Sequence, residues 1–188
     1  MTTLTAVLFA GGESRRMGAD KAELVWDGKP FWSRQLRTLG ELNLQKIFIS
    51  ARTRPSWCPS QVEAVLDEPP SRGPLSGLVA ALERIQTSHL LALAIDLPQM
   101  TPAHLKKLWS LAQPGVGVIP QNGKFFEPLC AVYSVETIGI AAKERAGSNV
   151  SLQSLARILA KRNDVRIYPL NKGEQTLYAN VNTPADLK

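Results

Sequence analysis

Cysteine is scarce in this chain. Among its 188 residues only Cys58 and Cys130 are cysteines, and no C-x-x-C pair or further cluster of ligands accompanies either of them. A structural zinc site or a disulfide framework needs several cysteines or histidines at close spacing, so the sequence argues against both. Two isolated thiols are typical of a protein from a reducing compartment, and we expect this protein to be cytoplasmic.

Long hydrophobic runs are also lacking. No segment approaches about 18 consecutive apolar residues, the length that a membrane-spanning helix needs. Residues 1–9 carry no cationic stretch ahead of their apolar residues, unlike a secretory signal peptide. Internal repeats, low-complexity tracts and Ser/Gly linkers are absent as well. We therefore expect a single domain over residues 1–188 and no membrane partner.

The composition that remains is that of an ordinary globular core, with 44% hydrophobic and 20% charged residues. Lysine and arginine (22) outnumber aspartate and glutamate (16), which gives a net charge of +6. This excess suits a polyanionic ligand, although the same charge also serves solubility. Apart from one loop the cations are scattered, and no basic–aromatic motif accompanies them, so we expect no nucleic-acid partner.

Apolar runs of strand length alternate with segments of helical period along the chain. This alternation predicts an α/β fold of three layers, in which a doubly wound, mostly parallel sheet of the Rossmann-like kind carries crossover helices. Strands are expected at 4–9, 46–50, 62–66, 89–95, 116–120, 128–134, 165–168 and 177–181. Helices are expected to begin near Phe31, at Gly73-Pro74 and at Thr101, and to span 135–145, 151–162 and a segment from Asn182.

Polar features follow three of the predicted strands. They are the Gly-rich loop after the first strand, Asp67 after 62–66 and Asp96 after 89–95. Ligands of doubly wound sheets bind outside the carboxyl ends of the strands, so these features are expected at one edge. Since 89–95 is apolar throughout, as in a central strand buried on both faces, Asp96 is better explained as a metal ligand than as a turn residue.

The loop after the first strand is rich in glycine and in cations. Gly11 and Gly12 lack a Cβ, so backbone N–H groups there can approach a phosphate closely, and Arg16 and Lys21 bring positive charge to the same loop. Neither common phosphate loop fits. The spacing to Gly18 is wrong for G-x-G-x-x-G, and Lys21 is not followed by Ser or Thr as a Walker A loop requires.

Together with five further motifs, this loop resembles the sequences of the molybdenum cofactor guanylyltransferases. Segment 9–21 is similar to their L-A-G-G-x-S-x-R-M-G-x-D-K pattern. Further similar stretches follow in the family's order: 27–30 (DGKP), 73–78 (GPLSGL), 96–98 (DLP), 127–133 (EPLCAVY) and 180–184 (NVNTP). The resemblance spans nearly the whole chain and implies the nucleotide-diphospho-sugar transferase version of the Rossmann-like fold.

The same resemblance implies an activity. Such enzymes transfer GMP from GTP to the phosphate of molybdenum-bearing molybdopterin, forming molybdopterin guanine dinucleotide and releasing pyrophosphate. GTP and molybdopterin are then the expected substrates and Mg²⁺ the expected cofactor, since Mg²⁺ is usually bound by one or two carboxylates together with phosphate oxygens. Transient contact with molybdoenzymes or their chaperones is a further implied partnership.

The resemblance also implies a role for particular residues. Three are expected to be catalytic, because Arg16 and Lys21 would neutralise the β- and γ-phosphates and Asp96 would hold Mg²⁺. Nucleotide binding is expected from Phe9, Ala10, Gly11, Gly12, Lys21, Asp67, Gly77 and Asp96. The pterin side of the site is expected from Asn180 and Asn182.

Three other functions stay open. Cytidylyl transfer to the same cofactor is disfavoured by Gly11-Gly12, since loops of that sister group typically read A-A-G. A sugar-1-phosphate nucleotidyltransferase usually has Gly-Thr-Arg where this chain has 14–16 (SRR). A non-catalytic nucleotide-binding adaptor in cofactor delivery would be expected to have lost Lys21 or Asp96. One departure weakens base recognition, because 50–52 (SAR) stands where the family commonly places an Asn.

The remaining polar and aromatic residues predict little chemistry. His89 and His104 are interpreted as incidental residues, on a strand end and on a helix surface respectively. The four tryptophans are expected to fill the core or its margin. Basic residues between 143 and 172 are more typical of a solvated face than of a binding surface.

Overall fold

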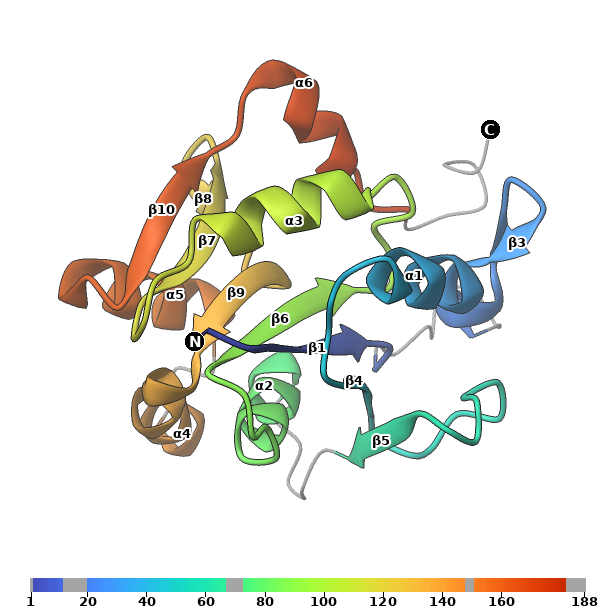
Figure 1. Cartoon of the computed structure of the whole chain (residues 1–188), viewed down its shortest axis with the longest axis horizontal. Helices are drawn as coiled ribbons and strands as arrows, with labels where there is room; N and C mark the ends of the chain where they lie inside the picture. The colour runs from blue at the N-terminus through green and yellow to red at the C-terminus, as the bar shows by residue number, and fades with distance from the viewer. Residues whose placement is uncertain (1, 12–19, 67–72, 148–150, 182–188) are drawn as a thin grey trace.

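The main sheet of the computed structural model is built from eight strands within the residues that it describes, which are 2–11, 20–66, 73–147 and 151–181. These strands are β1 (Leu4–Phe9), β4 (Ile47–Ala51), β5 (Glu63–Leu66), β6 (His89–Ala94), β7 (Gly117–Asn122), β8 (Phe125–Phe126), β9 (Cys130–Ser134) and β10 (Val165–Pro169). Their order across the sheet is β10-β7-β9-β6-β1-β4-β5, and β8 pairs with β7 (Figure 1).

Most neighbours in this sheet run parallel. Strand β1 lies between β4 and β6, and its Val7 is in register with Phe48 of β4 and with Ala92 of β6. The β4–β5 and β10–β7 pairs are also parallel, whereas β9 is antiparallel to β6 and to β7. The prediction of a doubly wound, mostly parallel sheet is confirmed.

Helices cover both faces of the sheet and make the three predicted layers. On one face lie α1 (Phe31–Gly40) and α3 (Pro102–Ser110), and on the other α2 (Pro74–Leu82), α4 (Ile138–Ala146) and α5 (Leu152–Arg162) (Figure 1). Strand β1 sends Ala6 and Leu8 into the first core and Val7 and Phe9 into the second. Burial on both faces explains why the central strands read as unbroken apolar runs.

No helix in the described ranges has the length and apolarity needed to cross a bilayer.

Two helices start where the sequence predicts. Thr101 accepts a hydrogen bond from the His104 N–H at the start of α3, with Pro102 in the first turn. Gly73 precedes α2 with φ of 77°, a conformation that a side chain would strain.

The predicted strand at 177–181 is wrong. The chain after β10 instead forms a short helix, α6 (Lys172–Gln175), and a 3-10 turn, η3 (Thr176–Tyr178). A capping box starts α6, because the Asn171 side chain accepts from the Glu174 N–H while the Glu174 carboxylate accepts from the Asn171 N–H. These local hydrogen bonds favour a helix over an extended chain. The helix predicted from Asn182 lies outside the described residues.

A small hairpin near the N-terminus was not expected. Strands β2 (Val25–Trp26) and β3 (Lys29–Pro30) pair antiparallel in a sheet of their own. The turn between them places Asp27 at φ of 50° and Gly28 at φ of 72°. An Asp-Gly pair with both φ angles positive is the turn that matches the twist of a two-residue hairpin.

The prediction that His104 lies on a helix surface is wrong. The His104 side chain faces the core from α3 and is 5% exposed. His89, at the start of β6, is fully buried, and its ring hydrogen-bonds to the Gln113 carbonyl oxygen at 3.0 Å. Burial lowers the pKa of both imidazoles.

Candidate active site

Strands β1, β4, β5 and β6 run parallel, so their carboxyl ends lie at one edge of the sheet, where the site was predicted. Strand β1 ends at Phe9 and β6 at Ala94. Just beyond them the Ile95 N–H donates to the Phe9 carbonyl oxygen at 3.1 Å. This hydrogen bond sets the loop after β1 directly beside the turn that carries Asp96.

Lys21 and Asp96 form an ion pair at this edge. The Lys21 Nζ lies 2.8 Å from the Asp96 Oδ2, and the two side chains are 21% and 23% exposed. Lys21 opens the 3-10 turn η1 (Lys21–Glu23), whose cap is Asp20, because the Asp20 carboxylate accepts from the Ala22 N–H. Two of the three predicted catalytic residues are thus brought together, in a position that remains open to solvent.

Helix α1 fixes the turn that follows Asp96. The Gln35 side-chain amide donates to the Leu97 carbonyl oxygen, and the Arg34 Nε donates to the Pro98 carbonyl oxygen, both at 2.6 Å. Gln35 is 1% exposed, so its hydrogen bond lies within the core. We had assigned no role to either residue. The available signal was that Gln35 is a polar residue four positions after Phe31, on the buried face of the helix.

The start of the Gly-rich loop is tied to β4. The N–H groups of Ala10 and Gly11 both donate to the Ser50 carbonyl oxygen, at 3.0 and 3.1 Å. A Cβ on Gly11 would meet its nearest neighbour, the Ala51 Cα, at 3.5 Å, which is an ordinary contact. Its φ is not in the positive region that favours glycine. Nothing in the described surroundings therefore requires glycine at position 11.

A second chain segment meets Asp96 from the other side. The Val181 N–H donates to the Asp96 carbonyl oxygen at 3.1 Å. Asn180, which was predicted to serve the pterin side, directly precedes Val181 and is exposed. Asp96 therefore contacts Lys21 through its side chain and the Asn180 segment through its backbone. The predicted nucleotide side, with Lys21, and the predicted pterin side, with Asn180, therefore adjoin at Asp96.

Other predicted residues are placed less directly. Phe9 is buried against the α2 side of the sheet, so only its backbone faces the edge. Gly77 is buried in the second turn of α2. The remaining predicted residues lie outside the described part of the chain: Gly12, Arg16, Asp67 and Asn182.

Glu127 is a further carboxylate near the site, on the segment that leads into β9. Burial raises its pKa. It lies within electrostatic range of Cys130 and Tyr178. Sequence reasoning had noted its motif but assigned the side chain no role.

Solved structures share this fold. Molybdopterin-guanine dinucleotide biosynthesis protein A from Archaeoglobus fulgidus superimposes with a TM-score of 0.73 at 22% identity, over 97% of this chain and 94% of that one. A nucleotidyl transferase from Methanothermobacter thermautotroptrophicus gives 0.74 at 13% identity, over 99% and 94% of the two chains. The fold is thus that of nucleotidyltransferases, as predicted.

Sequence comparison is more specific. The family model described as the MobA-like NTP transferase domain matches residues 6–165. A protein from Opitutus terrae named "Probable molybdenum cofactor guanylyltransferase" is 32% identical over 188 residues, which is 98% of this chain and 93% of that protein. The chain belongs to the MobA-like NTP transferase family.

Proposed function

We propose that this enzyme transfers GMP from GTP to the phosphate of molybdenum-bearing molybdopterin, giving molybdopterin guanine dinucleotide and pyrophosphate. The observation that carries the proposal is the ion pair between Lys21 and Asp96, 2.8 Å long and partly exposed at the carboxyl edge of the sheet. The name of the Opitutus terrae relative supports the same reaction. Asn180, beside the backbone contact of Asp96, supports a second substrate on the other side.

The reaction needs little covalent work from the protein. An oxygen of the molybdopterin phosphate attacks the α-phosphorus of GTP, a new P–O bond forms, and the bond to the β-phosphate bridging oxygen breaks. Pyrophosphate carries away the electron pair of that bond. Because attacking and attacked groups are both anionic, catalysis rests on positioning and on neutralising charge. Lys21 would supply positive charge to the β- and γ-phosphates, and the sequence predicts the same role for Arg16.

Asp96 fits a magnesium ion that arrives with the nucleotide. Among the described residues no group of three or more His, Cys, Asp or Glu side chains could hold a metal ion. One partly exposed carboxylate is nevertheless sufficient for Mg²⁺, whose other ligands are phosphate oxygens and water. When bound, the ion would supply positive charge at the reacting phosphates. Lys21 would then turn from the Asp96 carboxylate to the phosphates.

A comparison of nucleotides tests the guanine assignment. Mg²⁺–GTP should raise the melting temperature more than Mg²⁺–CTP, since a ligand that binds only the folded state stabilises it in proportion to its affinity. Asp96→Asn should lose the magnesium-dependent part of the GTP shift. Asp164→Asn is the matched control, because Asp164 pairs with Arg162 at 2.7 Å on an exposed surface. Equal shifts, or a larger shift with CTP, would contradict the assignment.

We also propose a cytoplasmic location and transient contact with molybdoenzymes or their chaperones. The location is supported by Cys58 and Cys130, which are both free thiols and both buried. The contact follows from the product, because a completed cofactor must be passed to an enzyme that uses it. Cross-linking of the product-loaded protein to a purified molybdoenzyme would test the contact, and no increase over the product-free protein would count against it.

A further inference from the structure

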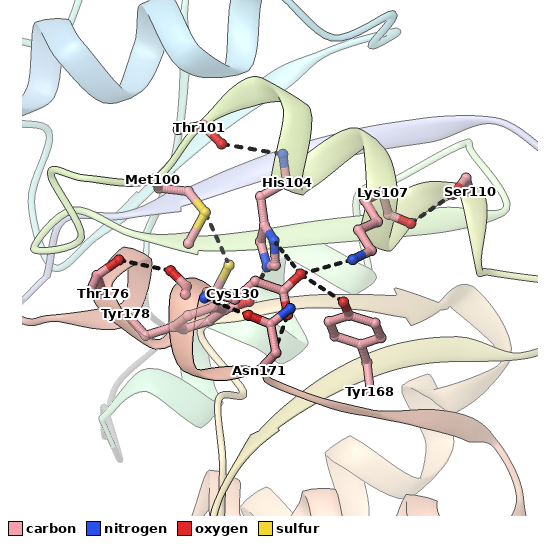
Figure 2. A network of polar contacts seen from close by, with 12 residues as sticks. Met100, Thr101, His104, Lys107, Ser110, Cys130, Tyr168, Asn171, Thr176 and Tyr178 are labelled. Atoms are coloured by element: carbon pink, nitrogen blue, oxygen red, sulfur yellow. Dashed lines mark hydrogen bonds and ion pairs between the residues drawn. The ribbon is translucent and has the colours of Figure 1, made fainter.

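A network of polar side chains lies between α3, β10 and the segment 171–181, which we call the arm (Figure 2). His104 Nε2 and the Tyr178 hydroxyl are 2.8 Å apart, and the two side chains are 5% and 6% exposed. Close by, Lys107 Nζ and the Tyr168 hydroxyl donate to the Glu174 Oε1 at 2.8 and 2.7 Å. Two side chains of the arm, Glu174 and Tyr178, are thus held by residues of α3 and β10.

The hydrogen bond between His104 and Tyr178 has polar neighbours at both ends. His104 Nδ1 faces the Glu174 carboxylate at 3.7 Å, and the Tyr178 hydroxyl also hydrogen-bonds to the Cys130 side chain. Burial lowers the pKa of His104 and raises that of Tyr178, so both groups are neutral. A buried pair of this kind is costly to break, because loss of one partner removes a hydrogen bond from a side chain that water does not reach.

The arm is fixed to the rest of the protein at three points along its length. Lys107 and Tyr168 hold Glu174 near its beginning, His104 holds Tyr178, and the Asp96 carbonyl oxygen holds its end through the Val181 N–H. Asn180 lies between the last two points, two residues after Tyr178 and one before Val181. Its backbone is therefore restrained on both sides while its side chain remains exposed.

Both restraints on Asn180 originate in one short stretch of chain. Asp96 begins the turn that α1 holds through Gln35, and α3 starts six residues later, with His104 in its first turn. Thr101 caps that turn by accepting from the His104 N–H at 3.3 Å. The catalytic turn and the clamp on the arm therefore share one rigid segment, and a displacement of the arm would displace Asn180 relative to Asp96.

On the basis of the proposed function, we infer that His104 and Tyr178 are positioning residues for the phosphate-bearing pterin acceptor. Their hydrogen bond fixes the arm so that Asn180 stands beside Asp96, where the acceptor phosphate meets the nucleotide. Neither side chain touches a substrate. The pair acts through Asn180, so its loss affects the acceptor and spares GTP.

The test uses Tyr178→Phe, which keeps the buried ring and removes only the hydroxyl. We expect the kcat/KM for molybdenum-bearing molybdopterin to fall about 10- to 100-fold, while the KM for GTP stays within about twofold. His104→Leu should have a similar effect, and the loss in the double variant should be smaller than the two single losses combined, because both substitutions remove the hydrogen bond between these residues. An unchanged kcat/KM for the acceptor, or an equal loss for GTP, would overturn the inference.

Tyr133→Phe is the matched control. Tyr133 is also a buried tyrosine, and its hydroxyl donates to the Pro128 carbonyl oxygen at 2.7 Å, but it lies on β9 and packs in the core on the other face of the sheet from Tyr178. The same substitution there should lower the melting temperature by a similar amount and leave both substrates unaffected. A matching loss of acceptor turnover in Tyr133→Phe would mean that general destabilisation explains the effect.

A second readout does not depend on the reaction. Amide hydrogen exchange at Val181 should be faster in Tyr178→Phe and in His104→Leu than in the unmodified protein, and unchanged in Tyr133→Phe. Unchanged exchange in Tyr178→Phe would overturn the inference even if the enzyme is active. If the unmodified protein transfers no GMP, the proposed function fails and the acceptor role with it, while the exchange rates still decide whether the pair holds the arm.

Discussion

The two side-chain contacts that flank Asp96 in the proposed site differ in their exposure. On the proposed nucleotide side, Lys21 pairs with the Asp96 carboxylate while both side chains remain about one-fifth exposed. On the proposed acceptor side, the hydrogen bond between His104 and Tyr178 is buried, and it adjoins the more exposed contacts of Glu174 with Lys107 and Tyr168 (Figure 2).

This difference follows from what each side has to do. Under the proposed function, Lys21 exchanges one anionic partner for another during every turnover, so its pair has to be accessible and easily separated. The arm only has to hold Asn180 in place while substrates come and go, and buried hydrogen bonds suit that task. Changes on the nucleotide side should therefore alter chemistry and GTP affinity, whereas changes around His104 should alter stability and acceptor use.

The largest effect is expected where the two sides meet. Asp96→Ala should lower transfer by at least about 10³-fold, because it removes the proposed metal ligand at the reacting phosphates. Pyrophosphate release with GTP, Mg²⁺ and molybdenum-bearing molybdopterin measures this loss, and Asp164→Ala should retain full activity. Turnover retained by Asp96→Ala would refute the metal role.

Removal of the lysine should have the next largest effect. Lys21→Met should raise the KM for GTP about 10- to 100-fold, since a charge-assisted hydrogen bond to a phosphate contributes roughly 1.5–3 kcal/mol. Titration calorimetry with Mg²⁺–GTP measures the affinity directly. Lys46→Met is the control, because Lys46 is an exposed lysine that pairs with Glu63 away from the site. Equal affinities of Lys21→Met and the unmodified protein would exclude phosphate binding by Lys21.

Alanine substitutions at Gly117 and Gly11 distinguish an effect on packing from an effect on ligand binding. A Cβ on Gly117 would overlap the Val132 carbonyl oxygen, so Gly117→Ala should lower the free energy of unfolding by roughly 1–3 kcal/mol. Gly11→Ala meets only ordinary contacts and should change that free energy by less than about 1 kcal/mol while weakening GTP binding. Urea unfolding and GTP titration of both variants measure the two effects. Unchanged GTP affinity in Gly11→Ala would remove the case for close approach of a ligand there.

The smallest expected effect is a dependence of stability on pH. Burial lowers the pKa of His89 and His104 in the folded state below the ordinary 6.5, so the unfolded chain binds protons first as the pH falls. Stability should decrease as the pH falls from about 6.5 toward the folded pKa values. His104→Gln should show a shallower decrease in urea unfolding across this range. An identical slope would mean that His104 does not titrate differently on folding.

A further loss of stability is expected in more acidic solution. Burial alone would raise the pKa of Glu174, but hydrogen bonds from Lys107, Tyr168 and the Asn171 N–H lower it to about 2. The stability that this carboxylate supplies is present above its ordinary pKa of 4.5 and is lost as the pH falls toward 2. Glu174→Gln should remove this part of the acid response, and an unchanged response would show that the carboxylate is protonated alike in both states.

The sheet, and the position of Asp96 at its carboxyl edge, could be predicted from the sequence because their signals are local. The central strands are unbroken apolar runs, Thr101-Pro102 is a helix start, and Asp96 follows the strand whose position defines the edge. The sequence assigns Lys21 and Asp96 to the same phosphates, but it does not predict an ion pair between them. Their direct contact depends on the register of β1 and β6.

The acceptor side could not be predicted to the same extent, because its contacts join segments far apart in the chain. Tyr178 and His104 are 74 residues apart and carry no shared motif. Two signals were nevertheless present. Asn171 and Glu174 have the spacing of a capping box, and His104 lies four residues before Leu108, on the buried face of its helix. The first signal predicts the helix that starts after Asn171, and the second predicts that His104 is buried.

The most direct test of the whole account is a label-transfer measurement. GTP labelled at the α-phosphate is incubated with the unmodified protein, Mg²⁺ and molybdenum-bearing molybdopterin, beside an equal reaction with labelled CTP. The account predicts that label from GTP appears on the pterin, that Asp96→Ala transfers none, and that CTP serves poorly. Transfer from CTP in preference to GTP, or no transfer from either nucleotide, would contradict it.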